Sequence, residues 1–291
     1  MIDIQALFVA VSLMVALGVL LATILAIANK KLHVFEDPRI DVVEGMLPSA
    51  NCGACGEPGC RAFAEKVVKG GATPGQCTVS SSDGREDIAH FLGVDVGAQE
   101  KRVARLACAG GNNVARQRVE YLGLPTCQAA HLVAGGGKGC VWGCLGLGDC
   151  ERVCDFGAIT MNEWGLPVVD EEKCTACNDC VEVCPKDLFS LHPISHKLWV
   201  ACKNEVFGED AEIECEVACT ACGRCAADAP EGIIEMKNNL AVIDYSKIEK
   251  VTDTCIQRCP TGAIVWLGEK GWVKKGVGAK GIIRKTPLPI G

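Results

Sequence analysis

Cysteine is the residue most able to do chemistry in this sequence, with 21 copies in 291 residues, many at regular spacings. The most specific run is C-x2-C-x2-C-x3-C-P, made of Cys174, Cys177, Cys180, Cys184 and Pro185. Three Cys of such a run ligate one [4Fe–4S] cluster, and the fourth reaches across to a second cluster. The spacing therefore predicts a pair of iron–sulfur clusters, whose chemistry is electron transfer rather than bond making.

A partner motif lies upstream, at Cys140, Cys144, Cys150 and Cys154. In bacterial two-cluster ferredoxins the fourth Cys of each motif is exchanged. The first predicted ligand set is therefore Cys154, Cys174, Cys177 and Cys180. The second set contains Cys144, Cys150 and Cys184 and needs one further ligand. Leu147 stands where the usual spacing has that Cys, and Cys140 is the nearest substitute.

The framework repeats later in the chain at one constant offset in residue number. The residues Cys127, Cys140, Cys144, Cys150 and Cys184 recur as Cys202, Cys215, Cys219, Cys225 and Cys259. A short segment after the cross-over Cys repeats as well, Gly157-Ala158-Ile159 matching Gly262-Ala263-Ile264. So many coincident positions indicate a duplicated unit, and each copy is expected to be a compact α+β ferredoxin-like domain.

The second copy is incomplete. It keeps the run Cys219, Cys222 and Cys225, but Ala229 replaces the cross-over Cys before Pro230. No Cys lies between Cys225 and Cys255; that stretch holds Ile248, Val251 and Thr252 instead. One cluster is therefore predicted in this copy, on Cys219, Cys222, Cys225 and Cys259. Its neighbour is lost, which leaves Cys255 as a buried free thiol.

Four Cys remain unassigned: Cys108, Cys127, Cys202 and Cys215. Four is the number that one cubane needs, and matched positions of both copies contribute, so a further [4Fe–4S] cluster could bridge the two copies. Two alternatives stay open. The four could be isolated buried thiols, or Cys140 could belong to this group in exchange for one of its members.

The first cysteine group of the chain is Cys52, Cys55, Cys60 and Cys77, with the spacing C-x2-C-x4-C-x16-C. Glycines at 53, 56 and 59 permit the tight turns and positive φ values that wrap a backbone round a cubane. A helix is expected from Arg61 to Lys69. Zinc is the alternative, but it favours two C-x2-C pairs, whereas three Cys are close here and one is remote.

Composition bounds the remaining possibilities. The odd number of Cys and the length disfavour a secreted disulfide scaffold. A net charge of −7 disfavours nucleic acid as a partner. Basic residues gather near the end, and this tail is either solvated or a contact for an acidic partner or lipid headgroups. The members of this group are Lys270, Lys274, Lys275, Lys280, Arg284 and Lys285.

Several motifs do not carry chemistry. The segment Gly135-Gly136-Gly137-Lys138-Gly139 resembles a phosphate loop but lacks the following Ser or Thr, so an approach loop to Cys140 is expected. No dinucleotide fingerprint is present, so the chain itself is not expected to bind flavin or nicotinamide. The five His show no paired spacing and are expected to be structural or superficial: His33, His90, His131, His192 and His196. No catalytic nucleophile, acid or base is expected.

A membrane anchor is predicted near the N-terminus. No charged residue occurs from Ile4 to Ala28, and a helix of that length spans roughly 37 Å. A secretory signal is disfavoured because the apolar run is too long and no cleavage site follows. Lys30 and Lys31 follow the run, so the positive-inside rule places the N-terminus outside and the rest in the cytoplasm. The expected location is the inner (cytoplasmic) membrane, in a single pass.

The predicted organisation is one N-terminal transmembrane helix followed by small α+β iron–sulfur domains. The expected boundaries are an anchor at 1–31, a 4Fe-4S domain at 35–80, a polar hinge at 81–105, a first ferredoxin-like repeat with two clusters at 106–195, a second repeat with one cluster at 196–268, and a basic tail at 269–291.

This order resembles the B subunit of the Rnf complex, in its long form with extra ferredoxin repeats, over nearly the whole chain. The most specific segments are Asn51-Cys52-Gly53-Ala54-Cys55-Gly56 with Gly59-Cys60, Gly143-Cys144-Leu145-Gly146-Leu147-Gly148-Asp149-Cys150, and Asn238-Asn239-Leu240-Ala241-Val242-Ile243-Asp244-Tyr245.

The resemblance implies a subunit of an ion-translocating ferredoxin:NAD oxidoreductase. Such a subunit accepts electrons from soluble ferredoxin and relays them to partner subunits in the membrane. The lost cluster around Ala229 departs from a full second ferredoxin pair. The alternatives are a polyferredoxin subunit of another respiratory or hydrogenase complex and, from another class, a structural zinc-binding module.

Overall fold

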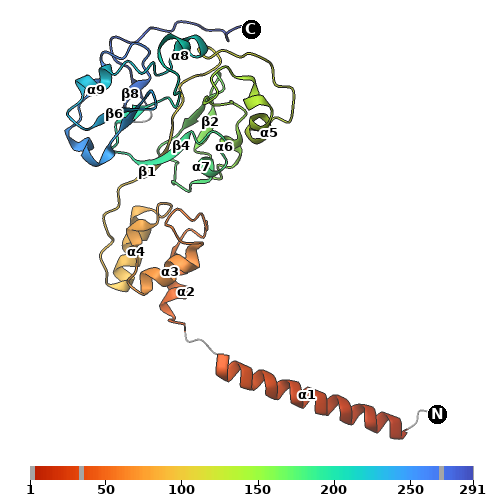
Figure 1. Cartoon of the computed structure of the whole chain (residues 1–291). Helices are drawn as coiled ribbons and strands as arrows, with labels where there is room; N and C mark the ends of the chain where they lie inside the picture. The colour runs from red at the N-terminus through yellow and green to blue at the C-terminus, as the bar shows by residue number, and fades with distance from the viewer. Residues whose placement is uncertain (1–3, 33–35, 269–271, 291) are drawn as a thin grey trace.

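The computed structural model describes residues 4–32, 36–268 and 272–290 (Figure 1). Helix α1 (Ile4–Leu32) is 29 residues long, and its segment Phe8–Lys31 has a mean hydropathy of 2.7 and is not buried by the rest of the chain. It is long and apolar enough to span a membrane. Residues 1–3 of the predicted anchor and 269–271 of the predicted tail, which include Lys270, lie outside the described residues, as does His33.

The N-terminal domain is helical and has its own small core. It contains α2 (Arg39–Met46), α3 (Cys60–Val68), the 3-10 helix η1 (Pro74–Gln76) and α4 (Ser82–Leu92). Its helices pack through Val43, Phe63, Val67 and Ile88, all at most 2% exposed. Helix α3 starts at a cysteine and turns its apolar side to this core, so that packing of the core fixes the position of Cys60.

The expected hinge at 81–105 is mostly ordered structure, which corrects that boundary. Ser81 caps α4 by accepting a hydrogen bond from the Gly84 N–H, and Gly93 ends the helix in the left-handed region. The Gly75 N–H then donates to the Val96 carbonyl at 2.6 Å, which ties the following segment to the same domain. The polar composition of this stretch belongs to the solvent-facing side of an amphipathic helix rather than to a linker.

The remaining chain forms a lobe of two related units. The first contains β1 (Arg102–Leu106) paired with β4 (Phe189–Pro193), the hairpin β2 (Ile159–Met161) and β3 (Pro167–Val169), and the helices α5 (Cys127–Leu132), η2 (Ala134–Gly137), α6 (Asp149–Arg152) and α7 (Asp179–Glu182). All of its strand pairs within the described residues are antiparallel.

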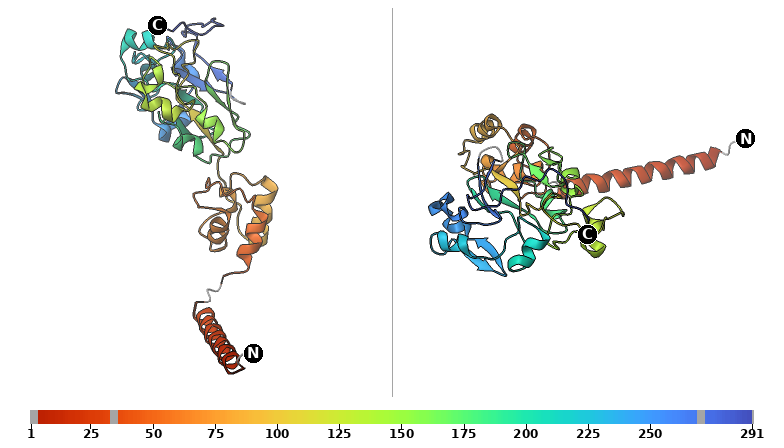
Figure 2. Two further views of the ribbon diagram at one scale, coloured as in Figure 1. Left: turned by 90° about the vertical axis from the view of Figure 1, so that its right-hand side faces the viewer. Right: turned by 90° about the horizontal axis from the view of Figure 1, so that it is seen from above.

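The second unit repeats this plan. It contains β5 (Leu198–Val200) paired with β8 (Ile264–Leu267), which also pairs with β9 (Val273–Lys274), and the hairpin β6 (Ile234–Lys237) and β7 (Leu240–Ile243). Its helices are α8 (Gly208–Glu214), α9 (Arg224–Asp228), η3 (Tyr245–Lys250) and η4 (Asp253–Ile256). Figures 1 and 2 show the two units side by side, with the N-terminal domain beside the first.

Equivalent hydrogen bonds set the true register of the duplication. The Ala107 N–H donates to the Leu188 carbonyl at 2.8 Å, and the Ala201 N–H donates to the Ala263 carbonyl at 2.8 Å. Leu188 and Ala263 keep the constant offset of the repeated cysteines, whereas Ala107 and Ala201 are farther apart in the sequence. Ala263 therefore corresponds to Leu188, and the match of Gly157-Ala158-Ile159 with Gly262-Ala263-Ile264 does not follow the register of the duplication. The first unit therefore carries an insertion after its first strand, in a segment that contains α5 and Cys127. A constant offset hides this insertion.

The site that the second unit lost is filled by side chains. Cys255 is 1% exposed, and its thiol donates to the Thr252 carbonyl at 3.2 Å. Ala229, Ile248 and Val251 pack against the same core. Cys255 is a buried thiol in an apolar setting, as the sequence predicts.

The C-terminal segment is a strap that is bonded to both units, an arrangement that neither reading of the tail, as solvated or as a contact for an acidic partner or lipid, includes. Arg284 donates to the Asn113 carbonyl at 2.6 Å and pairs with Glu216, while the Leu288 N–H donates to the Asn112 carbonyl at 2.8 Å. Lys280 pairs with Glu212 of α8. Arg284 and Lys280 are thus paired within the chain, whereas Lys275 and Lys285 are exposed.

Two histidines that showed no pairing in the sequence lie together at the junction of the units. The Nδ1 atoms of His192 and His196 are 3.3 Å apart, and the ring of His196 stacks on Tyr245 with centroids 4.4 Å apart. Trp199 completes the group and donates from Nε1 to the Leu106 carbonyl at 2.8 Å. The i, i+4 spacing was the available signal, although these residues flank a strand end rather than sit on one helix.

Candidate iron–sulfur ligand sites

The 21 cysteines, all within the described residues, fall into five groups of four and one single residue. In the N-terminal domain, Cys52, Cys55, Cys60 and Cys77 line one pocket. In the second unit, Cys219, Cys222, Cys225 and Cys259 line another. Both groupings are those expected from spacing.

The first unit contains two groups. The thiols of Cys174, Cys177 and Cys154 lie close enough to Cys180 to oppose its ionisation, which makes these four one group, again as spacing predicts. The other pocket of this unit is lined by Cys127, Cys144, Cys150 and Cys184. Its fourth member is Cys127, not the expected substitute Cys140. The insertion after β1 brings Cys127 to the place that Leu147 leaves without a thiol.

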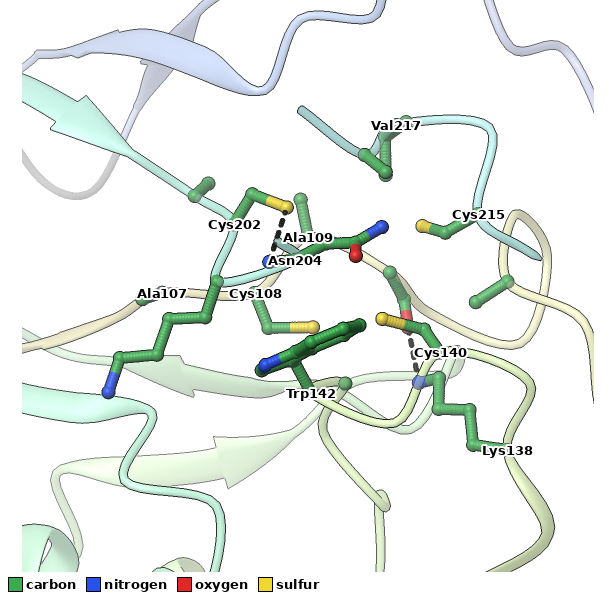
Figure 3. Close-up of a pocket in the computed structure, with 16 residues that line it drawn as sticks. Ala107, Cys108, Ala109, Lys138, Cys140, Trp142, Cys202, Asn204, Cys215 and Val217 are labelled. Carbon is green, nitrogen blue, oxygen red and sulfur yellow. Dashed lines mark hydrogen bonds between the residues drawn. The ribbon is translucent and has the colours of Figure 1, made fainter. Parts of the chain in front are cut away.

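The fifth group lies between the two units. A pocket there is lined by Cys108, Cys140, Cys202 and Cys215, and Figure 3 shows their four sulfurs pointing into one space. This is the partition in which Cys140 changes places with Cys127. The Cys144 N–H donates to the Cys108 sulfur at 3.4 Å, and the Cys219 N–H donates to the Cys202 sulfur at 3.3 Å. Cys108 and Cys202 are therefore equivalent positions, so both units contribute alike.

Backbone and hydroxyl donors point at the sulfurs in several groups. Ala158 donates to Cys154 at 3.3 Å, Ala104 to Cys174 at 3.4 Å, and Leu188 to Cys184 at 3.5 Å. In the N-terminal domain the Ser80 hydroxyl donates to Cys77 at 3.2 Å. Hydrogen bonds to ligand sulfur are the means by which proteins set the potential of iron–sulfur clusters. The residues present therefore fit such clusters.

The turns that carry the ligands are strained in the same way in both units. Ala176 and Ala221 each stand directly before the second Cys of a Cys-Thr-Ala-Cys segment, with φ of 59° and 58°. Non-glycine residues rarely take positive φ, and such strain gathers at functional sites. The turns hold two thiols on one side of the loop, where a single centre can reach both.

Burial makes these thiols difficult to ionise unaided. Burial raises the pKa of Cys150 to about 12, and the nearby thiols of Cys127 and Cys184 contribute to the same rise. Burial likewise raises the pKa of Cys215 to about 12, with smaller contributions from Cys108 and Cys140. A coordinating metal centre deprotonates a thiol outright. Binding of a cluster would therefore displace the protons of these thiols.

A single metal ion would need the four sulfurs of a group close together. Four sulfurs at about 2.3 Å from one zinc ion lie within about 4 Å of each other. Among the described residues, no group of three or more His, Cys, Asp or Glu side chains is placed to hold one metal ion, His192 and His196 included. Four convergent thiols are the ligand set that one [4Fe–4S] cubane needs.

The five groups form one row. Thr78, next to Cys77, donates to the carbonyl of Thr175, next to Cys174, at 2.7 Å. Cys180 adds to the raised pKa of Cys150, so their two groups are neighbours. The hydrogen bonds from Cys144 to Cys108 and from Cys219 to Cys202 connect the next two steps. The row therefore runs from the N-terminal domain, through the first unit and the interunit group, to the second unit.

Comparison with known proteins agrees with this arrangement. Residues 47–79 match the family described as "Putative Fe-S cluster", and residues 139–188 match the "4Fe-4S dicluster domain" family. The chain is 40% identical to the B subunit of the Na(+)-translocating ferredoxin:NAD(+) oxidoreductase complex of Acetobacterium woodii, over 89% of this chain and 78% of that protein. The chain belongs to the family of Rnf B subunits.

Two further Rnf B subunits are similar over most of their length. The B subunit of the ion-translocating oxidoreductase complex of Methanosarcina acetivorans is 36% identical over 87% of this chain and 96% of that protein. The B subunit of the proton-translocating ferredoxin:NAD(+) oxidoreductase complex of Clostridium ljungdahlii is 37% identical over 86% of this chain and 89% of that protein. The predicted family and fold class are confirmed. Iron–sulfur domains, membrane association and membership of a multisubunit complex follow from the family and from α1.

Proposed function

We propose that this chain is the electron-transfer subunit of an ion-translocating ferredoxin:NAD oxidoreductase, accepting electrons from ferredoxin and relaying them to partner subunits in the membrane. The observation that carries the proposal is the single row of five four-cysteine groups. When bound, a [4Fe–4S] cluster at each group supplies a one-electron centre whose potential depends on charge, burial and hydrogen bonds to sulfur.

Five clusters are proposed, with twenty of the 21 cysteines as ligands. The proposed sets are Cys52, Cys55, Cys60 and Cys77; Cys154, Cys174, Cys177 and Cys180; Cys127, Cys144, Cys150 and Cys184; Cys108, Cys140, Cys202 and Cys215; and Cys219, Cys222, Cys225 and Cys259. Cys255 is excluded because its thiol donates to a backbone carbonyl and its surroundings are apolar.

The proposed entry point is the outer end of the second unit. Cys222 is the only one of the 21 cysteines that is exposed, so an external donor can approach this group most closely. Arg224 lies two residues further on and is exposed, and Arg258 lies near Cys222, where it pairs with Asp228. Asp228 offsets the charge of Arg258, so the positive charge of Arg224 is the one that suits an acidic electron donor and speeds its encounter.

The proposed exit is the N-terminal domain. It stands at the other end of the row and follows the predicted anchor directly in the chain. Lys30 and Lys31 at the end of α1 support a cytoplasmic position for everything after them. The contact of Thr78 with Thr175 brings the first unit against this domain, so electrons proposed to enter at Cys222 would leave beside the membrane.

The proposal is tested with the full chain purified anaerobically in detergent and mixed rapidly with reduced ferredoxin. The substitution Arg224→Glu reverses one charge at the proposed entry. It is expected to slow reduction by ferredoxin several-fold at low salt while leaving reduction by dithionite unchanged. Lys69→Glu, on the exposed surface of the N-terminal domain, is the matched control. Equal slowing in both variants, or no slowing in Arg224→Glu, would contradict entry at Cys222.

A further inference from the structure

Lys138 is a buried cation between two of the cysteine groups. The residue is 8% exposed, and it lines the pocket of Cys108, Cys140, Cys202 and Cys215 (Figure 3). Its Nζ atom donates to the Gly110 carbonyl at 2.5 Å and to the Cys144 carbonyl at 2.6 Å. Cys144 belongs to the neighbouring group of the first unit. The ammonium therefore lies beside both groups.

The conformation of the loop before Lys138 places this side chain in the interior. Gly135, Gly136 and Gly137 have φ of 74°, 84° and 82°, a left-handed stretch that other residues rarely adopt. A Cβ on Gly137 would lie 2.5 Å from the Val119 carbonyl oxygen. The conformation and close packing of this glycine-rich segment bring a lysine into the interior, where it approaches cysteine groups rather than a phosphate.

No carboxylate forms an ion pair with Lys138 in the part of the chain that the structure describes. Glu214 lies beside the next residue, Gly139; its Oε1 atom pairs with Arg118, and its buried Oε2 atom has no hydrogen-bond partner within the described residues. Burying an unpaired ammonium is costly unless an opposite charge lies close by. The cysteine thiolates of the two adjacent groups would supply that charge.

We propose that Lys138 raises the reduction potentials of the two adjacent clusters, on Cys108, Cys140, Cys202 and Cys215 and on Cys127, Cys144, Cys150 and Cys184. The inference rests on the clusters proposed above. Each one-electron reduction adds negative charge to a site already surrounded by thiolates, and a buried positive charge stabilises the reduced form more than the oxidised form. The two clusters in the middle of the row are then reduced at a higher potential than they would be without the lysine.

The test is an EPR-monitored redox titration of the full chain, purified anaerobically, with Lys138→Met against wild type. Methionine keeps most of the length and removes the charge. At the potential where half of the wild-type sites are reduced, the ratio of reduced to oxidised sites in Lys138→Met is expected to be about tenfold lower. For a one-electron couple this corresponds to a midpoint potential about 59 mV lower. Lys138→Arg keeps the positive charge, so its midpoint potential should stay close to that of wild type. Cys140→Ser identifies the signal of the interunit site by removing it.

Lys186→Met is the matched control. Lys186 also lies near Cys140 and Cys184 and donates to the Val141 carbonyl at 2.8 Å, but it is partly exposed, so solvent screens its charge and a smaller shift is expected. The N-terminal site, remote from Lys138, should not move in any variant.

An unchanged midpoint in Lys138→Met with full iron content would overturn the proposal, as would an equal shift in Lys186→Met. Lys138→Gln keeps a hydrogen-bond donor and is titrated as the second uncharged variant. Loss of iron from both uncharged variants would also overturn it, because Lys138 would then hold the fold rather than set a potential. The iron content of wild type tests the cluster assignment separately from these differences.

Discussion

The hydroxyl of Thr78 donates a 2.7 Å hydrogen bond to the carbonyl oxygen of Thr175, and each residue follows directly after a cysteine of a different group. Cys77 belongs to the N-terminal domain and Cys174 to the first ferredoxin-like unit. Covalent bonds and this one hydrogen bond therefore connect the two cysteines. This contact is the place where electrons are proposed to pass between the domains.

Replacing Thr78 by Val removes the hydroxyl and keeps the shape of the side chain. A neutral hydrogen bond contributes about 0.5–1.5 kcal/mol, so the docked arrangement should be several-fold less populated. Reduction of the N-terminal site should slow by about the same factor, with iron content and midpoint potentials unchanged. Rapid-freeze EPR after mixing with a reductant that enters at the second unit measures this rate. Thr78→Ser keeps the donor and should behave as wild type; an unaltered rate in Thr78→Val would remove the contact from the route.

The partition of the cysteines predicts opposite outcomes for two substitutions. Cys127→Ser should lower the iron content from about twenty to about sixteen atoms per chain, because it removes a ligand of a [4Fe–4S] site. Cys255→Ser should leave the content at about twenty. Iron and sulfide analysis of anaerobically purified protein measures both. Full iron in Cys127→Ser, together with normal EPR spectra, would return Cys127 to the class of isolated thiols.

The His192 side chain should make stability depend on acid pH. Burial, followed by the charges of His196, Arg105 and Arg102, lowers its pKa from 6.5 to about 4. Between these two pH values the unfolded chain binds the proton on His192 and the folded chain does not. The free energy of unfolding therefore carries no penalty from His192 above about pH 6.5, and it falls as the pH drops toward 4.

His192→Phe keeps an aromatic ring against Trp199 and Tyr245 and removes this titration. The difference in stability between pH 7 and pH 5, followed by denaturant unfolding, should be smaller in His192→Phe than in wild type. The exposed His131→Gln serves as a control and should keep the wild-type pH dependence. An identical pH profile in all three proteins would show that burial of His192 does not affect folding.

The strap should be sensitive to one glycine and insensitive to another. A Cβ on Gly276 would lie 2.6 Å from the Gln257 Cα and would also clash with the Ile256 carbonyl, both backbone atoms that cannot move aside easily. Gly281 has no atom within 4 Å of such a Cβ. Gly276→Ala should therefore destabilise the lobe by about 1–3 kcal/mol, whereas Gly281→Ala should be close to neutral. Thermal unfolding of both variants measures the difference, and equal melting temperatures would contradict a packed strap.

Much of the arrangement could be predicted from spacing because a ligand loop fixes which cysteines converge. The four cysteines from Cys52 to Cys77 and the run from Cys174 to Cys180 are local, so the order of the residues nearly determines the geometry. The repeat also located the incomplete position at Ala229, where the structure has apolar packing. The family resemblance rested on these same segments.

What could not be predicted depended on insertions and on tertiary packing. A constant offset equates Cys127 with Cys202, whereas strand register equates Cys108 with Cys202. Only the fold reveals the insertion that moves Cys127 into another group. The polar composition of 81–105 suggested a hinge because the caps of α4 and the burial of Ile88 are weak local signals. The engagement of Arg284 with Glu216 joins residues 68 positions apart, beyond the reach of pattern reading.

The apolar packing around Ala229 and Cys255 has a consequence for how the row of cysteine groups evolved. Cys255 is the counterpart of Cys180, which borders the N-terminal end of the row in the first unit. Because the two units are duplicates, a sixth centre beside Cys255 would have stood beyond the group of Cys219, at the end of the row opposite the N-terminal domain. Without such a centre the row stays continuous, and it ends in the second unit at the group of Cys219, which contains the exposed Cys222 and is where electrons are proposed to enter.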